Sequence, residues 1–100
     1  MAQIVWTEPA AGDIAEVAEH IALDKPDAAA NFVSEVLAAI ERLADFPLSG
    51  RMVPEFPTDR YREIVVFPCR VIYTASPEAV VILRIIRGER LLRRSMLSSH

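Results

Sequence analysis

Three runs of β-branched and aromatic residues, joined by very short links, constrain the fold of this chain more than any other feature. They are residues 61–67, 70–75 and 80–87. Val, Ile, Tyr and Phe dominate these runs, which is the composition of β-strands. The first link is only Pro68 and Cys69, too short for anything but an antiparallel return. A turn at 76–78, which contains Pro77, makes the second link. The second half of the chain therefore predicts a three-stranded antiparallel meander.

The first half begins with a short strand and continues with the periodicity of helices. Residues 3–7 are β-branched and aromatic, which predicts the strand. Thr7 then stands where a helix N-cap belongs, and apolar residues recur after it at the spacing of one helical face. Pro26 opens a second apolar stripe, which Pro47 and Gly50 bring to an end. Because only a few residues join the two helices, we expect an antiparallel helical hairpin.

These elements predict one α+β domain over residues 1–100, in the order β-α-α-β-β-β, with the helical hairpin packed on a small antiparallel sheet. The length fits one domain, and 52% hydrophobic with 25% charged residues is a globular composition. The single cysteine, Cys69, excludes an intrachain disulfide. No signal-peptide pattern and no apolar stretch of about 18 residues occurs. We therefore expect a cytoplasmic protein with no membrane span.

Charge is divided unevenly between the two halves of the sequence. Residues 1–50 carry two basic and nine acidic side chains, whereas residues 51–100 carry nine arginines, five acids and no lysine. Arginine presents a planar fork to carboxylates, phosphates and bases. One interpretation is that the basic half meets an acidic partner. The alternative is a pair of solvated helices beside an ordinary charged sheet rim.

Each of the three predicted strands carries an arginine in or beside it, namely Arg62, Arg70 and Arg87. Arginine is costly to bury, so three adjacent strands predict a sheet with one cationic face. Strict alternation also groups Ile86 with Val80 and Ile82 on one face of the last strand. Neither face is then cleanly polar, and the sheet needs two covers. The helical hairpin supplies one, and the C-terminal tail or another chain supplies the other.

The whole chain resembles the ParE/RelE toxin superfamily of bacterial type II toxin–antitoxin systems, and within it the ParE branch. The resemblance rests on the order and spacing of short strings over almost the full length. They are Trp6-Thr7-Glu8, Asp13-Ile14, Pro26-Asp27-Ala28-Ala29, Phe46-Pro47, Gly50-Arg51, Pro54-Glu55, Tyr61-Arg62-Glu63, Arg70-Val71-Ile72-Tyr73 and Gly88-Glu89-Arg90.

The resemblance implies a toxin neutralised by a cognate antitoxin, expected to be ParD-like and of the ribbon–helix–helix type. ParE-like toxins are associated with DNA gyrase, whereas RelE-like toxins cleave mRNA on the ribosome. The leading interpretation is a gyrase inhibitor that works by protein binding. The alternatives are a ribosome-dependent endoribonuclease and a degenerate toxin that only binds its antitoxin.

RNA cleavage needs a base, cations for the charged phosphorane and a proton donor. If the chain is a nuclease, Glu63 is the candidate base, and Arg70, Arg87 and Arg90 are the candidate cations. Arginine does not exchange its proton near neutral pH. Many relatives have a histidine where this chain has Arg87. No metal site and no cofactor is expected, and the nuclease set is incomplete.

As a binding protein, the chain is expected to hold the antitoxin in the groove between the sheet and the helical hairpin. Acidic antitoxin side chains should meet arginines of the meander. The candidate binding residues are Arg62, Arg70, Tyr73, Arg84, Arg87 and Arg90. Cys69 and Trp6 are expected to pack in the core or a turn, and His20 has no second metal ligand nearby in sequence.

Overall fold

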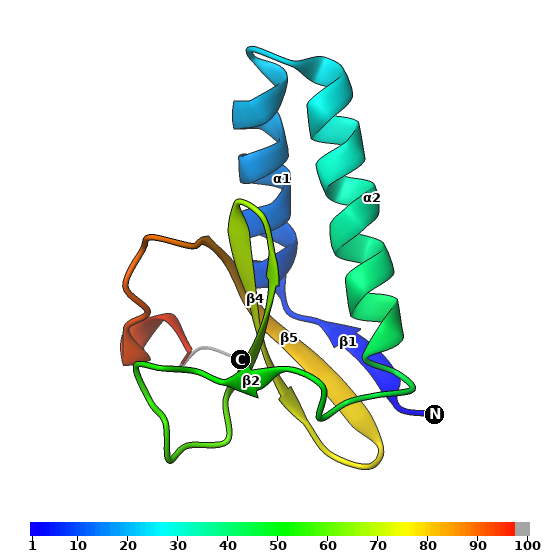
Figure 1. Ribbon diagram of the computed structural model, residues 1–100, viewed down its shortest axis with the longest axis vertical. Coiled ribbons are helices and arrows are strands. Elements are labelled where there is room, and N and C mark those ends of the chain that lie inside the picture. The colour runs from blue at the N-terminus through cyan, green and yellow to red at the C-terminus, as the bar shows by residue number, and fades with distance from the viewer. Residues whose placement is uncertain (98–100) are drawn as a thin grey trace.

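The computed structural model describes residues 1–97, in which two antiparallel helices cover one face of a five-stranded sheet (Figure 1). The strand order is β1-β5-β4-β3-β2. The elements are β1 Gln3–Trp6, α1 Glu8–Ala22, α2 Pro26–Arg42, β2 Arg51–Met52, β3 Arg62–Val66, β4 Cys69–Ala75, β5 Ala79–Arg87 and a 3₁₀ turn at Arg94–Met96. The predicted α+β class and element order are confirmed.

Both helices begin where the sequence predicts. The Thr7 hydroxyl accepts a hydrogen bond from the Ala10 N–H at 3.3 Å, which caps α1. The same hydroxyl donates to the Ile82 carbonyl at 2.8 Å and so ties the start of α1 to β5. Pro26 occupies the first turn of α2, where its missing N–H costs no helical hydrogen bond. The cap residue therefore also fixes the hairpin's position on the sheet.

The sheet is mixed rather than antiparallel throughout. β3, β4 and β5 form the predicted antiparallel meander. β1 lies parallel to β5, with Ile4 opposite Val80 and Trp6 opposite Ile82. β2 is a two-residue strand that pairs with the start of β3, at a place where the sequence predicts no strand. A run so short, followed by Pro54, has no periodicity from which it could be recognised.

A register shift in β5 makes the predicted face assignment wrong. Ile72 lies opposite Arg84 and Tyr73 opposite Ile82, so Leu83 is an extra residue on β5. Beyond this bulge the alternation is displaced by one residue. Ile85, and not Ile86, therefore joins Val80 and Ile82 under the helices, while Ile86 lies with Leu83 on the other face.

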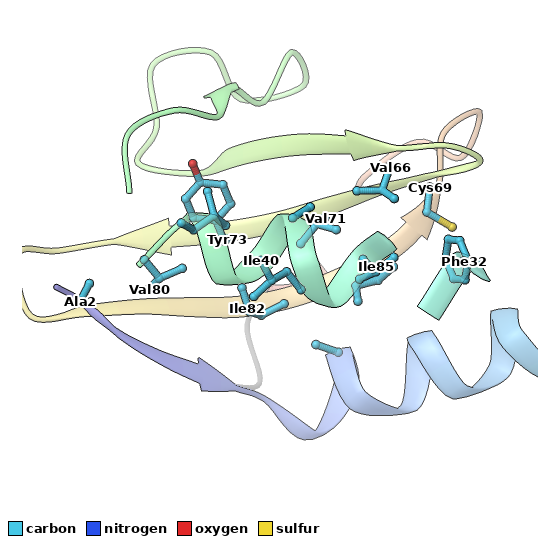
Figure 2. Packing of buried hydrophobic residues seen from close by; sticks show 14 residues of the cluster. Ala2, Phe32, Ile40, Val66, Cys69, Val71, Tyr73, Val80, Ile82 and Ile85 are labelled. Carbon is cyan, nitrogen blue, oxygen red and sulfur yellow. The ribbon is translucent and has the colours of Figure 1, made fainter. Parts of the chain in front are cut away.

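The sheet is covered on both faces by this chain's own residues. Under the hairpin, Phe32 and Ile40 of α2 pack against Val71, Tyr73 and Ile85 (Figure 2). On the opposite face, Ile72, Leu83 and Ile86 form a second cluster with Val53 of the loop and Leu92 and Leu97 of the tail. A fully buried Leu or Ile contributes about 1.5–3 kcal/mol. Of the two candidate covers for this face, the tail is the one observed, and the loop after β2 assists it.

Candidate functional site

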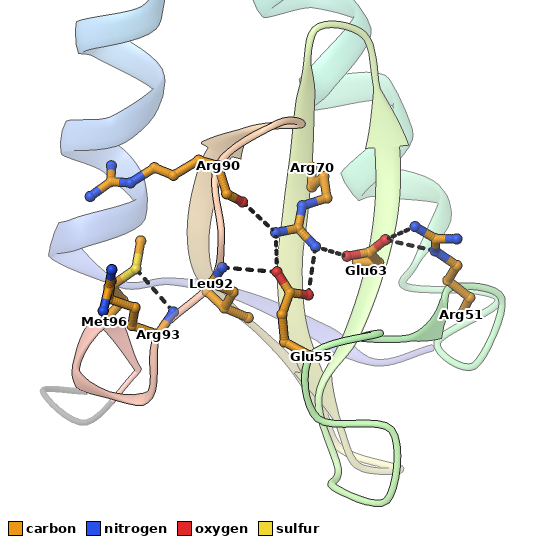
Figure 3. Close-up of polar contacts among 8 residues, drawn as sticks. All are labelled: Arg51, Glu55, Glu63, Arg70, Arg90, Leu92, Arg93 and Met96. Carbon is orange, nitrogen blue, oxygen red and sulfur yellow. Dashed lines mark hydrogen bonds and ion pairs between the residues drawn. The ribbon is translucent and has the colours of Figure 1, made fainter.

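The charged residues of the sheet are organised around Arg70, whose side chain is only 7% exposed. One terminal nitrogen donates to Glu63 at 2.8 Å and to Glu55 at 3.0 Å. The other donates to Glu55 at 2.8 Å and to the Arg90 carbonyl at 2.9 Å (Figure 3). Arg70 Nε is buried and has no hydrogen-bond partner within residues 1–97. The guanidinium thus joins β4, β3, the loop and the tail.

The Glu63 carboxylate lies between two arginines. One oxygen accepts from Arg70, and the other accepts from Arg51 Nε at 2.6 Å. The Glu63 side chain is fully buried, whereas that of Arg51 is 63% exposed. We call Arg51, Glu55, Glu63 and Arg70 the Arg70 network. Its two positive and two negative charges balance, which is the condition under which buried ions are tolerated.

Glu55 connects the Arg70 network to the C-terminal tail. Its carboxylate pairs with Arg70 and also accepts the Leu92 N–H at 2.8 Å. Hydrogen bonds from Arg70 and from Leu92 lower the pKa of Glu55 to about 2, against the opposing effect of burial. The hydrogen bonds with Glu55 raise the pKa of Arg70, with a further contribution from the Glu63 charge. Both groups are therefore fully charged near neutral pH and hold the start of the tail against the sheet.

Tyr73 is buried, with its hydroxyl bonded on both sides. It donates to the Pro47 carbonyl and accepts the Gly50 N–H, each at 2.9 Å. Burial raises the pKa of the phenol. A Cβ atom at Gly50 would lie 2.5 Å from the Tyr73 hydroxyl and 2.7 Å from the Glu63 carbonyl. Glycine is therefore required here by close approach, and the predicted Gly50 turn is built around Tyr73.

The remaining arginines of the predicted binding set lie in three different settings. Arg84 forms a two-pronged pair with Asp13 of α1 at 2.7 and 2.9 Å, and this pairing raises the pKa of Arg84. Arg62 donates to the Gly50 carbonyl at 2.8 Å. Arg87 is exposed and paired with Glu89 at 2.9 Å.

The expectation of a single cationic face is therefore wrong. Arg70 lies on the face covered by the loop and tail, while Arg62 and Arg87 lie opposite Tyr73 and Cys69, which face the helical hairpin. Arg70, Tyr73 and Arg84 are engaged inside the fold and present little or no surface to a partner. Arg87 and Arg90 remain exposed. Sequence reasoning missed Glu55, Arg51 and Asp13 as the partners of these residues, because nothing in the spacing links them to the strands.

Two grooves open beside the sheet. The α2–β3 groove, of about 720 Å³, lies between the C-terminal half of α2 and β3, with Arg42, Arg51 and Phe67 in its lining. The α1–β5 groove, of about 450 Å³, is lined by Glu16, His20, Arg87 and Arg90 among others. Both lie between the helical hairpin and the sheet, which is where the sequence predicts a partner to bind.

The described residues offer no other chemistry. No group of three His, Cys, Asp or Glu side chains that could hold a metal ion occurs within residues 1–97. Cys69 is fully buried, and burial raises the pKa of its thiol, so the side chain packs as part of the core. His100 lies outside the described residues. Among the described helices, none is long and apolar enough to span a membrane.

Residues 4–92 match the protein family described as "ParE toxin of type II toxin-antitoxin system, parDE". The chain belongs to the ParE toxin family. It is 36% identical over 92 residues to "Toxin RelE2" of Caulobacter vibrioides, which covers 91% of this chain and 100% of the relative. It is 41% identical over 49 residues to "Putative toxin Y4kP" of Sinorhizobium fredii, which covers 49% of this chain and 51% of that one.

A solved structure described as "Chromosomal ParDE TA system from P. aeruginosa" shares the fold of this ParE-family toxin. The TM-score is 0.76 at 22% sequence identity, covering 89% of this chain and 98% of that chain. The predicted membership of the ParE/RelE toxin superfamily is confirmed. The protein is the toxin of a type II toxin–antitoxin system, and the names of its relatives include both ParE and RelE.

Proposed function

We propose that this toxin inhibits DNA gyrase in the cytoplasm by binding it, without cutting RNA, and is neutralised by a ribbon–helix–helix antitoxin encoded beside it. The ParE family match supports gyrase as the target, and the closure of the Arg70 network argues against RNA cleavage. The candidate base Glu63 and the candidate cation Arg70 are both buried, and they are paired with each other and with their neighbours through the Glu63 carboxylate and the two terminal nitrogens of Arg70.

A nuclease built on these residues would need them to reach a substrate. A general base must come within hydrogen-bond distance of the 2′-hydroxyl that it deprotonates. Both oxygens of Glu63 are occupied by arginines, and its side chain is fully buried. Arg70 is likewise engaged by two carboxylates and a carbonyl. Opening this site to RNA would leave buried charges unpaired, which costs several kcal/mol.

The exposed arginines favour binding over proton transfer. Arg87 and Arg90 line the α1–β5 groove and can meet carboxylates or phosphates with a rigid fork of donors. A guanidinium does not act as an acid or base near neutral pH. We infer that acidic antitoxin side chains meet Arg87 and Arg90, whereas Arg70, Tyr73 and Arg84 hold the surface in shape from within. Arg62 supports the turn at Gly50 through its hydrogen bond to the Gly50 carbonyl.

Expression of the toxin without its antitoxin separates the candidate activities. Gyrase inhibition predicts filamentation with induction of the DNA-damage response and intact transcripts. Transcripts cut at codon positions would instead establish the ribonuclease. Normal growth at verified protein levels would establish a degenerate toxin.

Charge reversal tests the proposed antitoxin contact. The double variant Arg87→Glu/Arg90→Glu should bind the antitoxin at least about tenfold more weakly, which corresponds to about 1.4 kcal/mol. Lys25→Glu, at the exposed far end of the hairpin, is a control for charge reversal away from the groove and should bind like the wild type. Equal affinity of the double variant and the control would refute this placement.

A further inference from the structure

The outer edge of β3 is only half covered. β2 pairs with β3 at Arg62 and Glu63, and the Val53 N–H donates to the Tyr61 carbonyl just before them. Backbone groups of a strand alternate in direction, so Tyr61, Glu63 and Val65 point their N–H and C=O groups to this edge. β2 satisfies the first two. For Val65 the structure records no backbone or side-chain partner at this edge within residues 1–97.

The unpaired edge of β3 opens onto the α2–β3 groove. Ala38 and Ala39 of α2 form part of its wall, and Ile64, Val65 and Val66 of β3 form its edge. Small side chains on the helix leave a volume of about 720 Å³ along the strand. Strands in a sheet lie about 4.8 Å apart. The groove can therefore admit one more extended backbone beside β3, in line with β2.

Exposed apolar side chains mark the same stretch. Val65 is 64% exposed and Phe67 is 86% exposed, although both follow a buried part of the sheet. An exposed apolar edge strand is a template for pairing with another chain, and proteins generally cover or charge such edges. Here the edge carries no charged side chain between Glu63 and Arg70, so it is open to an occupant.

The charges at the rim of the groove define the kind of occupant. Arg42 is exposed and has no ion-pair partner within the described chain, and Arg51 is 63% exposed. Both line the groove, with Glu35 farther along α2. An extended segment with apolar residues over Val65 and a carboxylate at Arg42 matches this surface. A second copy of this chain would instead bring its own Arg42 and Arg51 close to the same two arginines, and like charges would face each other.

We propose that the antitoxin adds a β-strand to the free edge of β3, in line with β2, so that its backbone pairs with Val65 and an acidic side chain meets Arg42. This inference rests on the proposed antitoxin partnership and names the mode of binding at one of its grooves. Recognition by strand addition takes its affinity from backbone hydrogen bonds and its specificity from flanking side chains.

Amide hydrogen exchange of the complete toxin tests the proposal directly. The amides of Ile64 and Val66 point to β4 and should be protected in the free toxin, whereas the Val65 amide should exchange rapidly. Saturation with the small protein encoded by the adjacent reading frame should slow exchange at Val65 at least tenfold. Rapid exchange at Val65 in the saturated complex would overturn strand addition while leaving neutralisation intact. Absence of any complex would refute the antitoxin partnership itself.

Protection of Val65 that grows with toxin concentration, without the second protein, would identify a second copy of the chain as the occupant and overturn the proposal. Sedimentation of the free toxin tests the same point, because it shows whether the toxin dimerises in the absence of the second protein.

Matched variants separate the backbone contact from the side chains. Val65→Pro removes the outward N–H without removing a hydrogen bond to β4, since proline is tolerated where a strand's N–H faces away from the ladder. It should weaken antitoxin binding about two- to tenfold, the range for one hydrogen bond. Val65→Thr keeps the N–H and should bind nearly as the wild type. Equal binding of a folded Val65→Pro variant would count against the proposal, and if it does not fold, wild-type exchange still decides.

Arg42→Glu tests the charge in the groove. This variant should bind the antitoxin at least about fivefold more weakly, because like charges would face each other across a groove whose cation is otherwise unpaired. Lys25→Glu makes the same charge change far from the groove and should have no effect. If Arg42→Glu and Lys25→Glu bind the antitoxin equally well, no acidic side chain of the antitoxin meets Arg42.

Discussion

Removal of the Arg70 guanidinium should be the most destabilising single change of a charged residue in the sheet. Arg70→Met would leave Glu63, which is fully buried, with only the exposed Arg51 as its partner. It would also release Glu55 and the Arg90 carbonyl. Breaking a buried ion pair from one side costs about 3–5 kcal/mol, a large share of the roughly 5–15 kcal/mol that stabilises a whole domain.

Urea unfolding followed by circular dichroism measures this cost. With a slope of about 1.5 kcal/mol per M for a small domain, Arg70→Met should lower the midpoint by roughly 2–3 M. The double variant Arg70→Met/Glu63→Leu should recover a substantial part, because paired charges replaced by apolar groups cost little. Lys25→Met is the control for loss of an exposed charge. If Arg70→Met loses less than about 1 kcal/mol, or the double variant recovers nothing, the Arg70 network does not stabilise the fold as described.

Four further outcomes follow from the site's geometry. Because the pKa of Glu55 is lowered to about 2 from 4.5, its contribution is complete above about pH 5 and is lost as pH falls towards 2. The stability difference between wild type and Glu55→Gln, measured in urea at each pH, should therefore shrink by roughly 1–3 kcal/mol over that range; a constant difference would contradict the lowered pKa. Tyr73→Phe should lower the free energy of unfolding by about 1–3 kcal/mol, because it leaves the buried Gly50 N–H without an acceptor. Gly50→Ala should cost a similar amount through overlap with the Tyr73 hydroxyl, and unchanged melting temperatures for these two would refute the described packing. Asp13→Asn should lower the melting temperature, since Asp13 holds both Arg84 and the Ile85 N–H, whereas the exposed Asp24→Asn should not.

The features set by neighbouring residues were accessible from the sequence. Thr7 and Pro26 act within their own helix turns. The link between β3 and β4 is Phe67 and Pro68 rather than the predicted Pro68 and Cys69, and two residues permit only an antiparallel return. These local constraints gave the correct element order. The groove between hairpin and sheet followed from the same arrangement.

The features set by distant residues were not accessible. The extra residue Leu83 in β5 lies in a run where apolar residues occur on both faces on either side of Arg84, so the alternation does not reveal the register shift. Arg70 was expected at the surface because isolated arginines are costly to bury. Its burial depends on Glu63 and Glu55, which are 7 and 15 positions away and reach it from another strand and a loop. Loop residues have no periodicity that would reveal such a role.

The most direct test of the proposed function is a supercoiling assay with purified DNA gyrase and purified toxin. We predict that the toxin blocks supercoiling in proportion to its concentration, that the antitoxin restores supercoiling, and that the toxin leaves ribosome-bound mRNA intact. Unimpaired supercoiling together with cleavage of ribosome-bound mRNA would contradict this prediction, because the closed Arg70 network would then have to open into a catalytic site.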